Sequence, residues 1–430
     1  MTGKPGSSAP ADGSPRKLVV VGQGYVGLPL AIRAVEAGFA VVGFDLDQGR
    51  VKRLSAGESY VEDIGDERLA AALATGRYEP TDDPARTAGF DVAVIDVPTP
   101  LTDGNPNLGY VEQAAAMLAT SLRPGATVVL ESTTYPGTTE ELVGPVLEAG
   151  SGLVAGRDFH LGYSPERIDP GNATWRFENT PKVVSGIDEP SLEAVRSFFD
   201  ALVERTVPVS GTREAELTKL LENTFRHVNI ALVNELAMFA EALDIDVWEA
   251  IDAASTKPFG YLRFTPGPGV GGHCLPIDPS YLSWKVRRSL GQPFRFVELA
   301  NDVNEHMPDY VVRRLTLAFN RQRRSVNGSR VLLLGLAYKR NTGDAREAPG
   351  EVIARTLLSL GAEVRVADPH LAAGATTFPL VDASANELEA ADGVVLVTDH
   401  DAFDYDLVAR HARYVLDTRN RLAGPQVEHL

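Results

Sequence analysis

The chain has only one cysteine among its 430 residues. A single thiol cannot build a disulfide framework within the chain or a cysteine-based zinc site, and it fits a reducing compartment. There is also no run of about 18 apolar residues, and residues 1–16 lack the apolar core of a secretory signal. We therefore expect a cytoplasmic protein without a membrane partner, in which Cys274 is either inert packing or a reactive thiol.

Positive charge is scarce, because 41 Lys and Arg are outnumbered by 58 Asp and Glu and the formal net charge is −17. Binding to nucleic acid needs a basic face, so no nucleic-acid partner is expected. An anionic substrate would need a local basic pocket within this negative field. The content of 44% hydrophobic and 23% charged residues is typical of globular proteins, and the length predicts two or three domains.

Apolar runs alternate with helix-like segments from Lys17 onwards. A strand over Leu18–Val21, a helix over Leu28–Ala37 and a strand over Phe39–Phe44 are followed by strand-like runs at Val92–Val97 and Thr127–Leu130. Such alternation predicts a parallel sheet covered by helices. The runs close into polar or Pro-rich turns, which would lie at the carboxyl edge of the sheet, where ligands bind.

Two later segments complete the predicted organisation. Thr212–Ala242 contains no Pro or Gly and has apolar residues at helical spacing, which predicts one long connecting helix. Val331–Leu334 followed by Gly335 repeats the pattern of the first strand and its glycine, but the later glycines are missing. We therefore expect an α/β protein with two Rossmann-like, doubly wound domains joined by a long central helix, the second of which serves another ligand or only builds the fold.

The first glycine turn, Gly22-Gln23-Gly24-Tyr25-Val26-Gly27, follows a predicted strand and opens a helix. In this setting the glycines allow a tight turn, close approach of a pyrophosphate and close packing of helix on strand. The amino end of the helix offers N–H groups and partial positive charge to the phosphates. Asp45 ends the second strand at the distance of an acid that binds a ribose hydroxyl, which favours NAD over NADP, while Asp47 is interpreted as a solvated neighbour.

The only cysteine follows a glycine-rich loop, residues 266–274, where backbone can press against a ligand. Asp278 comes four residues later and either polarises water or, before Pro279, forms a turn. Lys219 and Asn223 are four residues apart on the long helix. They lie on one helical face, where they either stabilise an oxyanion or belong to a solvated surface.

The chain resembles the UDP-glucose/GDP-mannose dehydrogenase family, closest to its UDP-N-acetylglucosamine 6-dehydrogenase branch. The resemblance is carried by Val21–Leu30, Tyr163–Arg167 and Lys257–Gly260 running into the Gly-Gly-His-Cys loop. In that family a thiol adds to an aldehyde made by a first oxidation, the adduct loses a second hydride to leave a thioester, and water opens the thioester. The thiol is needed because an aldehyde carbon donates no hydride readily until a nucleophile makes it tetrahedral. The resemblance makes Cys274 this nucleophile.

The other catalytic residues are also implied by the resemblance. It assigns Lys219 and Asn223 to the oxyanion, and Asp278 to positioning or activating water. It assigns Glu166 to thioester hydrolysis and Thr133 to the wall of the reacting centre. His273 beside the thiol is either an activating base or a structural residue.

Cofactor and substrate residues follow from the glycine turn together with the resemblance, and no metal site is predicted. The expected NAD-binding residues are Gly22, Gly24, Tyr25, Val26, Gly27, Asp45, Val97, Pro98, Thr99, Thr133 and Arg346. The expected substrate-binding residues are Glu166, Arg167, Lys219, Asn223, Tyr261, Phe264, Gly271 and Lys339. Lys339 and Arg346 would supply the local positive charge.

The sequence pattern, supported by the resemblance, predicts four segments and a homodimer. We expect a tail over 1–16, an NAD-binding domain over 17–210, a central helical dimerisation domain with the cysteine loop over 211–310, and a nucleotide-sugar-binding domain over 311–430. The long helix has apolar positions wider than one stripe, including Leu217, Phe225, Ile230, Val233 and Met238, which favours burial at a twofold axis near the loop 261–264. The alternative is that both flanking domains cover the helix.

The expected reaction is the four-electron oxidation of the C6 alcohol of UDP-N-acetylglucosamine to a uronate. Gly343 stands where relatives usually carry an acid and Arg263 where an apolar residue or Pro is commoner, so UDP- or dTDP-glucose in a secondary-metabolite pathway is the alternative. A two-electron hydroxy-acid dehydrogenase is a more remote alternative, but its reaction needs no thiol. A non-catalytic NAD sensor would leave Glu166, Lys219 and Cys274 unexplained.

Overall fold

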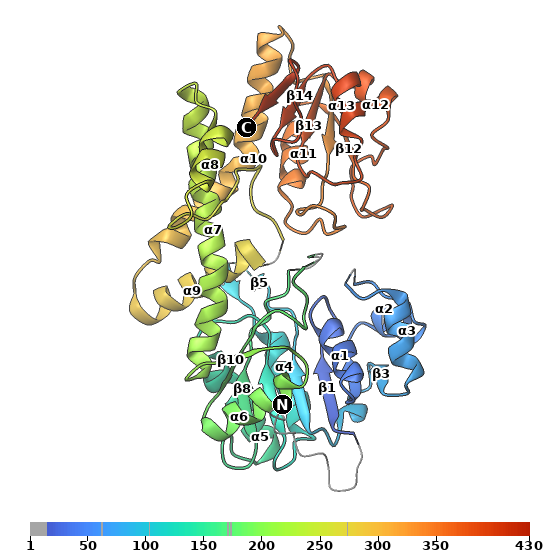
Figure 1. The fold of residues 1–430 in the computed structure, drawn as a ribbon, viewed down its shortest axis with the longest axis vertical. Coiled ribbons are helices and arrows are strands. Elements are labelled where there is room, and N and C mark those ends of the chain that lie inside the picture. Colours follow the sequence, from blue (N-terminus) through green and yellow to red (C-terminus); the bar gives the residue numbers. More distant parts are fainter. Residues whose placement is uncertain (1–14, 62, 103, 170–171, 173, 273) are drawn as a thin grey trace. The chain divides into compact units, whose positions relative to one another are not determined.

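The computed structural model describes residues 15–430 except 62, 103, 170–171, 173 and 273, and the chain divides into two compact units, residues 1–222 and 223–430 (Figure 1). Each unit is built around one largely parallel sheet with helices packed against it, and a long helix passes from one unit into the other. The predicted class, an α/β protein with two Rossmann-like sheets and a long connecting helix, is confirmed.

The sheet of the first unit has the strand order β10-β9-β8-β7-β4-β1-β2-β3. Its strands are β1 Lys17–Val21, β2 Ala40–Phe44, β3 Tyr78–Thr81, β4 Val92–Ile95, β7 Thr127–Leu130, β8 His160–Tyr163, β9 Lys182–Gly186 and β10 Thr206–Pro208. The strand order reverses at β1, which pairs in parallel with β2 on one side and β4 on the other. Such a reversal opens a ligand crevice at the carboxyl ends of the strands. Among the described strand pairs of this sheet, β8 and β9 are antiparallel, so β9 and its parallel neighbour β10 run opposite to the other strands.

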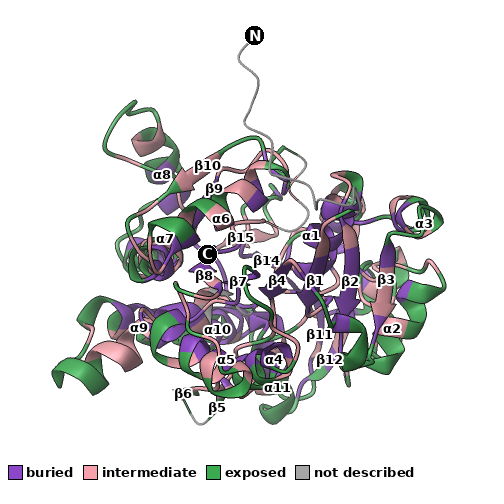
Figure 2. Ribbon diagram, turned by 90° about the horizontal axis from the view of Figure 1, so that it is seen from below, coloured by how far each residue is buried: buried purple, intermediate pink, exposed green. Residues whose placement is uncertain are grey.

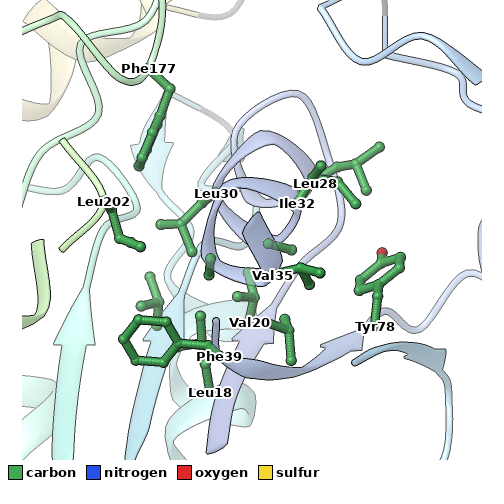
Figure 3. Packing of buried hydrophobic residues seen from close by; sticks show 14 of the residues in the cluster. Leu18, Val20, Leu28, Leu30, Ile32, Val35, Phe39, Tyr78, Phe177 and Leu202 are labelled. Carbon is green, nitrogen blue, oxygen red and sulfur yellow. The ribbon is translucent and has the colours of Figure 1, made fainter. Parts of the chain in front are cut away.

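Helices cover this sheet because their apolar stripes need burial. They are α1 Gly27–Glu36, α2 Gln48–Ser55, α3 Asp66–Ala74, α4 Gly109–Ala119, α5 Gly144–Ser151 and α6 Glu189–Asp200, with short turns at Pro84–Thr87 and Thr139–Val143 and a small pair of strands, β5 Leu101–Thr102 and β6 Asn105–Pro106. Figure 3 shows α1 packing on β1, with Leu28, Leu30 and Ile32 above Leu18 and Val20. The core therefore holds the first helix tightly against the strand that leads into the glycine turn.

The long helix α7 spans Thr212–Ala242, as predicted. Val233 is buried against α8 (Val247–Ser255), so this part of the predicted surplus apolar surface is covered within the second unit. Phe225, Leu232, Leu236 and Phe239 remain exposed.

The second unit contains a parallel sheet with the order β12-β11-β13-β14-β15. Its elements are β11 Arg330–Leu334, β12 Glu363–Ala367, β13 Gly393–Leu396, β14 Val415–Asp417, β15 Val427–His429, α9 Cys274–Leu290, α10 Arg295–Arg321, α11 Pro349–Ser359, α12 Ala385–Ala390 and α13 Tyr405–His411. The central strands of both sheets are buried along their length (Figure 2). Near-continuous hydrophobic strands of this kind are expected where helices cover both faces.

Candidate active site

The first glycine turn joins β1 to α1 and is closed by backbone contacts. Gly22 has a φ of +99°, and a Cβ there would lie 1.9 Å from the carbonyl oxygen of Asp96. A Cβ on Gly27 would lie 2.0 Å from the carbonyl oxygen of Gly22, so helix and strand need this glycine to approach each other. A Cβ on Gly24 would meet nothing within 4 Å. The middle glycine thus leaves open space for a pyrophosphate, and the turn fits NAD.

The carboxylate of Asp45 fastens the same turn. Oδ2 accepts a hydrogen bond from the backbone N–H of Gln23 at 2.9 Å, and Arg50 forms an ion pair with Oδ2 at 3.5 Å. The acid therefore lies beside the turn, at the position expected for a ribose contact. Asp47 does more than meet solvent, because its side chain caps α2 by accepting N–H groups of the first turn.

The segments that follow β4 and β7 are held together by one hydroxyl. Ser132 Oγ accepts the N–H of Val97 and donates to the Val97 carbonyl oxygen, each at 2.9 Å. These two hydrogen bonds hold Val97, the first residue of the predicted cofactor segment Val97–Thr99, against Ser132. The half-buried Thr133 is the next residue in the sequence. Val26 is the N-cap residue of α1, and Tyr25 is partly exposed.

Acidic side chains follow three neighbouring strands at this edge. Asp96 follows β4, Glu131 follows β7, and Glu166 lies three residues beyond β8. Lys182, the first residue of β9, donates one hydrogen bond to Glu131 and another, of 2.6 Å, to Glu166 Oε2. Burial raises the pKa of Glu131 well above its usual value, although Lys182 opposes this shift. Burial and the nearby charge of Glu166 raise the pKa of Asp96 to about 7.

Glu166 is held at every polar atom beyond its own N–H. Oε1 accepts the backbone N–H groups of Arg167 at 2.6 Å and Ile168 at 2.5 Å. Its backbone carbonyl oxygen accepts a hydrogen bond of 2.5 Å from Lys219 Nζ. Burial acts to raise the pKa of Glu166, but the charge and hydrogen bond of Lys182 outweigh it and the pKa lies below its usual value. Lys219 is therefore part of a packed polar cluster and not of a solvated helix face.

The guanidinium of Arg167 is bound by the protein itself. It forms an ion pair of 2.5 Å with Glu222 and donates a hydrogen bond of 2.7 Å to the carbonyl oxygen of Pro181. The predicted contact of Arg167 with substrate stays a prediction.

Sequence reasoning missed the buried Glu216, which lies one turn before Lys219 on α7. Its carboxylate accepts the N–H groups of Gly137 at 2.5 Å and Thr139 at 2.9 Å, together with the Thr139 hydroxyl at 2.7 Å. These bonds attach α7 to the loop that carries Thr133. Burial raises the pKa of Glu216 to about 7, against the opposing effect of the three donors.

The cysteine loop belongs to the second unit, where Cys274 is the first residue of α9. The side chain of Cys274 and the whole of His273 lie outside the described residues. A Cβ on Gly271 would lie 2.7 Å from Tyr338 Cβ, and one on Gly272 would lie 2.8 Å from the Tyr338 ring. The N–H of Gly272 donates to the carbonyl oxygen of Arg346 at 3.1 Å. The close approach that these glycines permit is therefore to the protein's own Tyr338.

Asn223 and Asp278 meet in the second unit. Both are buried, and Asn223 Nδ2 donates a hydrogen bond of 2.6 Å to Asp278 Oδ2. Asp278 lies inside α9, one turn after its first residue, and Pro279 is accommodated within the helix. The alternative interpretation of Asp278-Pro279 as a turn is therefore wrong, because the helix already begins at Cys274.

The predicted substrate segment around Lys339 is a tightly folded loop. Tyr338 donates its N–H to the Asp344 carbonyl oxygen at 2.9 Å, and Arg346 forms an ion pair of 2.5 Å with the Asp344 carboxylate. A Cβ at Gly343 would lie 2.5 Å from the carbonyl oxygen of His370. A residue with a Cβ could not occupy position 343 without a shift of this loop.

The second glycine turn resembles the first in its backbone and differs in its acid. A Cβ on Gly335 would lie 2.3 Å from the Thr398 carbonyl oxygen, as Gly22 approaches Asp96. Asp368, which follows β12, accepts two N–H groups of this turn and also contacts His400 Nε2 at 3.1 Å. Burial acts to raise the pKa of Asp368, but these hydrogen bonds lower it to about 2. The Asp368 side chain has no exposed surface, and its hydrogen bonds are made within the protein.

A basic pocket of about 240 Å³ in the second unit was not predicted from the sequence. Its lining residues are Trp248, Arg263, Thr265, Asp399, Arg419 and Asn420. Arg419 lies two residues beyond β14, and its Nε donates to the Val397 carbonyl oxygen at 2.8 Å. The available signal was its position after a strand, at the edge where ligands bind. Among the predicted neighbours, Phe264 packs edge-on against Phe225 at 5.7 Å, and Tyr261 is half-buried.

In the part of the chain that the structure describes, no helix has both the length and the hydropathy to cross a bilayer. No group of three or more His, Cys, Asp or Glu side chains within those same residues is placed to hold a metal ion.

The glycine turn with Asp45 and the polar cluster at the sheet edge define a dinucleotide-dependent oxidoreductase. Three models of the UDP-glucose/GDP-mannose dehydrogenase family match the chain: the NAD binding domain over 16–203, the central domain over 213–306 and the UDP binding domain over 332–424. The chain belongs to this family, uses NAD and is a nucleotide-sugar dehydrogenase.

Relatives and solved structures match along nearly the whole chain. UDP-N-acetyl-D-mannosamine dehydrogenase of Pyrococcus horikoshii is 34% identical over 96% of this chain and 97% of its own, and UDP-N-acetyl-D-glucosamine 6-dehydrogenase of Pseudomonas aeruginosa is 37% identical over 90% and 91%. The solved Pyrococcus horikoshii UDP-ManNAc dehydrogenase has a TM-score of 0.88 at 33% identity, covering 96% of this chain and 98% of its own. A UDP-glucose dehydrogenase from Pyrobaculum islandicum has a TM-score of 0.84 at 31% identity, covering 96% of each chain.

Proposed function

We propose that this protein oxidises the C6 alcohol of UDP-N-acetylglucosamine to the uronate in two NAD-dependent steps through a thioester on Cys274. The observation that carries the proposal is the Asn223–Asp278 hydrogen bond, which sets a buried amide and carboxylate at the helix that Cys274 begins. Relatives named for UDP-N-acetylhexosamines and for UDP-glucose support the substrate class. NAD, when bound, accepts one hydride in each oxidation.

The residues of this chain divide the chemistry between them in this proposal. Cys274 adds as a thiolate to the aldehyde, while Lys219 and Asn223 stabilise the oxygen that becomes negative. After the second oxidation, water opens the thioester, restores the thiol and forms the carboxylate. Glu166, whose pKa lies below its usual value, is ionised at neutral pH and can accept a proton from that water, and Asp278 orients it.

The proposal is tested by a panel of nucleotide sugars assayed to complete conversion. We expect two NADH per sugar and the highest kcat/KM with UDP-N-acetylglucosamine, compared with UDP-N-acetylmannosamine, UDP-glucose and dTDP-glucose. A ratio of one NADH with an aldehyde product would contradict the thioester route. Preference for UDP- or dTDP-glucose would retain the route and support the alternative substrate.

We also propose a homodimer in which residues 211–310 form the dimerisation domain. Exposed apolar residues on α7 recur at helical spacing, Phe225, Leu232, Leu236 and Phe239. Contiguous apolar surface of this kind is uncommon on a monomer and favours a partner helix. Light scattering at micromolar concentration is expected to give about twice the 46.2 kDa chain mass. A mass of one chain with full activity on dilution would refute the dimer.

A further inference from the structure

Lys182 is a buried ammonium enclosed by two acids and two aromatic rings. Its side chain is 4% exposed, and it donates to Glu131 and to Glu166 Oε2. The rings of Phe177 and Phe199 lie 5.6 and 5.2 Å from Nζ. Burial acts to lower the pKa of Lys182, but the two acids outweigh it and raise the pKa above its usual value. The side chain is therefore a fixed positive charge.

The charges that meet Glu166 come from every element around it. Glu131 faces it from the end of β7, Asp96 from the end of β4, Lys182 from β9 and Lys219 from α7. Glu131 Oε2 is buried without a hydrogen-bond partner among the described residues. Burial raises the pKa of Glu131 well above its usual value, whereas Lys182 holds the pKa of Glu166 below its usual value, so the Lys182 charge acts chiefly on Glu166.

We propose that Lys182 is a positioning residue for thioester hydrolysis, and that it keeps the Glu166 carboxylate ionised and fixed between Lys182 and the backbone N–H groups of Arg167 and Ile168. This inference rests on the proposed function, because hydrolysis is the step that uses Glu166. The same hydrogen bonds fix the orientation of the Glu166 backbone carbonyl oxygen, which accepts a hydrogen bond from Lys219. Lys182 acts through Glu166 and Lys219 and does not touch the reacting atoms.

The first test is Lys182→Met, which keeps the length of the side chain and removes its charge. Glu131 and Glu166 would then share a buried site without a cation, and Glu166 would take up a proton more readily. In the pH profile of kcat with UDP-N-acetylglucosamine, we expect the acid limb to move upward by about one unit or more. In stopped flow, we expect a burst of two NADH per subunit before a slow steady state, because thioester accumulates when hydrolysis is slowed. Lys182→Arg, which keeps the charge, is expected to return the acid limb to its original position.

The second test separates positioning from stability. The double variant Lys182→Met with Glu131→Leu replaces the buried pair by apolar side chains, an exchange that is often neutral or stabilising. Its thermal stability is expected to return toward that of the parent, while the shifted acid limb and the burst remain, because Glu166 still lacks its cation. This variant also keeps the inference testable if Lys182→Met alone does not fold.

Arg123→Met is the matched control. Arg123 pairs with Asp91, which precedes β4 and so lies at the opposite edge of the sheet. Its profile is expected to match that of the parent. The inference is overturned if the parent makes two NADH per sugar while Lys182→Met and the double variant keep the parental profile without a burst, or if the double variant recovers both stability and profile. A parent that makes one NADH per sugar would instead contradict the proposed function.

Discussion

The side-chain amide of Asn223 on α7 donates a hydrogen bond of 2.6 Å to Asp278 Oδ2 on α9. The bond joins a residue assigned to the oxyanion with one assigned to water, so the two are expected to act as a unit. Asn223→Ala and Asp278→Ala should each lower kcat. The loss of kcat in the double variant should be smaller than the product of the two single losses, with an interaction energy of about 0.5–3 kcal/mol. Steady-state kinetics of the four proteins measure this. Strictly multiplicative losses would show that the residues act independently.

Cys274→Ser is expected to lose overall turnover by several orders of magnitude, because an alcohol is a much weaker nucleophile than a thiolate at neutral pH. NAD affinity, measured by calorimetry, should survive because the glycine turn lies elsewhere in the sequence. Near-normal uronate formation by the variant would mean that the cysteine is packing.

Gly22→Ala and Gly24→Ala separate the fold of the turn from its function. A Cβ at Gly22 would lie 1.9 Å from the Asp96 carbonyl oxygen and the φ is +99°, whereas a Cβ at Gly24 meets nothing within 4 Å. Gly22→Ala should destabilise the protein by more than the ~1–2 kcal/mol of backbone strain alone. Gly24→Ala should unfold like the parent but bind NAD at least about tenfold more weakly, because the methyl group occupies the space for the pyrophosphate. Equal NAD affinity in Gly24→Ala would place the phosphates elsewhere.

Asp45→Ala should weaken NAD binding by about 1–3 kcal/mol and relax discrimination against NADP. The variant would remove the predicted ribose contact and leave Arg50, which lies 3.5 Å from Asp45, with Asp47 as its remaining acid partner at 3.8 Å. The double variant Asp45→Ala with Arg50→Ala is the control. In it, the improved use of NADP that is expected for Asp45→Ala should be lost. Steady-state constants for both cofactors decide the matter, and an unchanged preference would place the ribose elsewhere.

Glu216 should make the free energy of unfolding decrease as the pH rises towards 7. Its pKa is about 7 in the folded protein, above the value of about 4.3 expected for an unfolded chain, so the folded state holds the proton more tightly between these values. The contribution of Glu216 is therefore fully present below about pH 4 and is lost as the pH rises through about 7. Glu216→Gln cannot titrate and should lack this pH-dependent loss of stability, which is about 3–4 kcal/mol between the two pKa values. Chemical unfolding at several pH values tests the difference, and parallel curves for parent and variant would contradict it.

Much of the fold could be predicted because the signals are local. The bounds of α7 and β7 agree with the apolar pattern, since helical spacing and buried strands need only neighbouring residues. The strand predicted over Val92–Val97 ends at Ile95, because Asp96 already belongs to the turn that receives Gly22. The Asp278-Pro279 pair favoured a turn as strongly as catalysis in the sequence, and the helix that begins at Cys274 excluded the turn.

The sequence by itself determined the two glycine turns, the acid after β2, the long helix and the lone thiol, because each depends on the stereochemistry or periodicity of adjacent residues. Only the tertiary structure decided which polar groups meet. Lys182 lies 16 residues from Glu166 and 51 from Glu131, and Asp368 lies 32 from His400. These groups come together because strand ends from distant parts of the chain meet at one end of each sheet, where burial makes every charge depend on its partner.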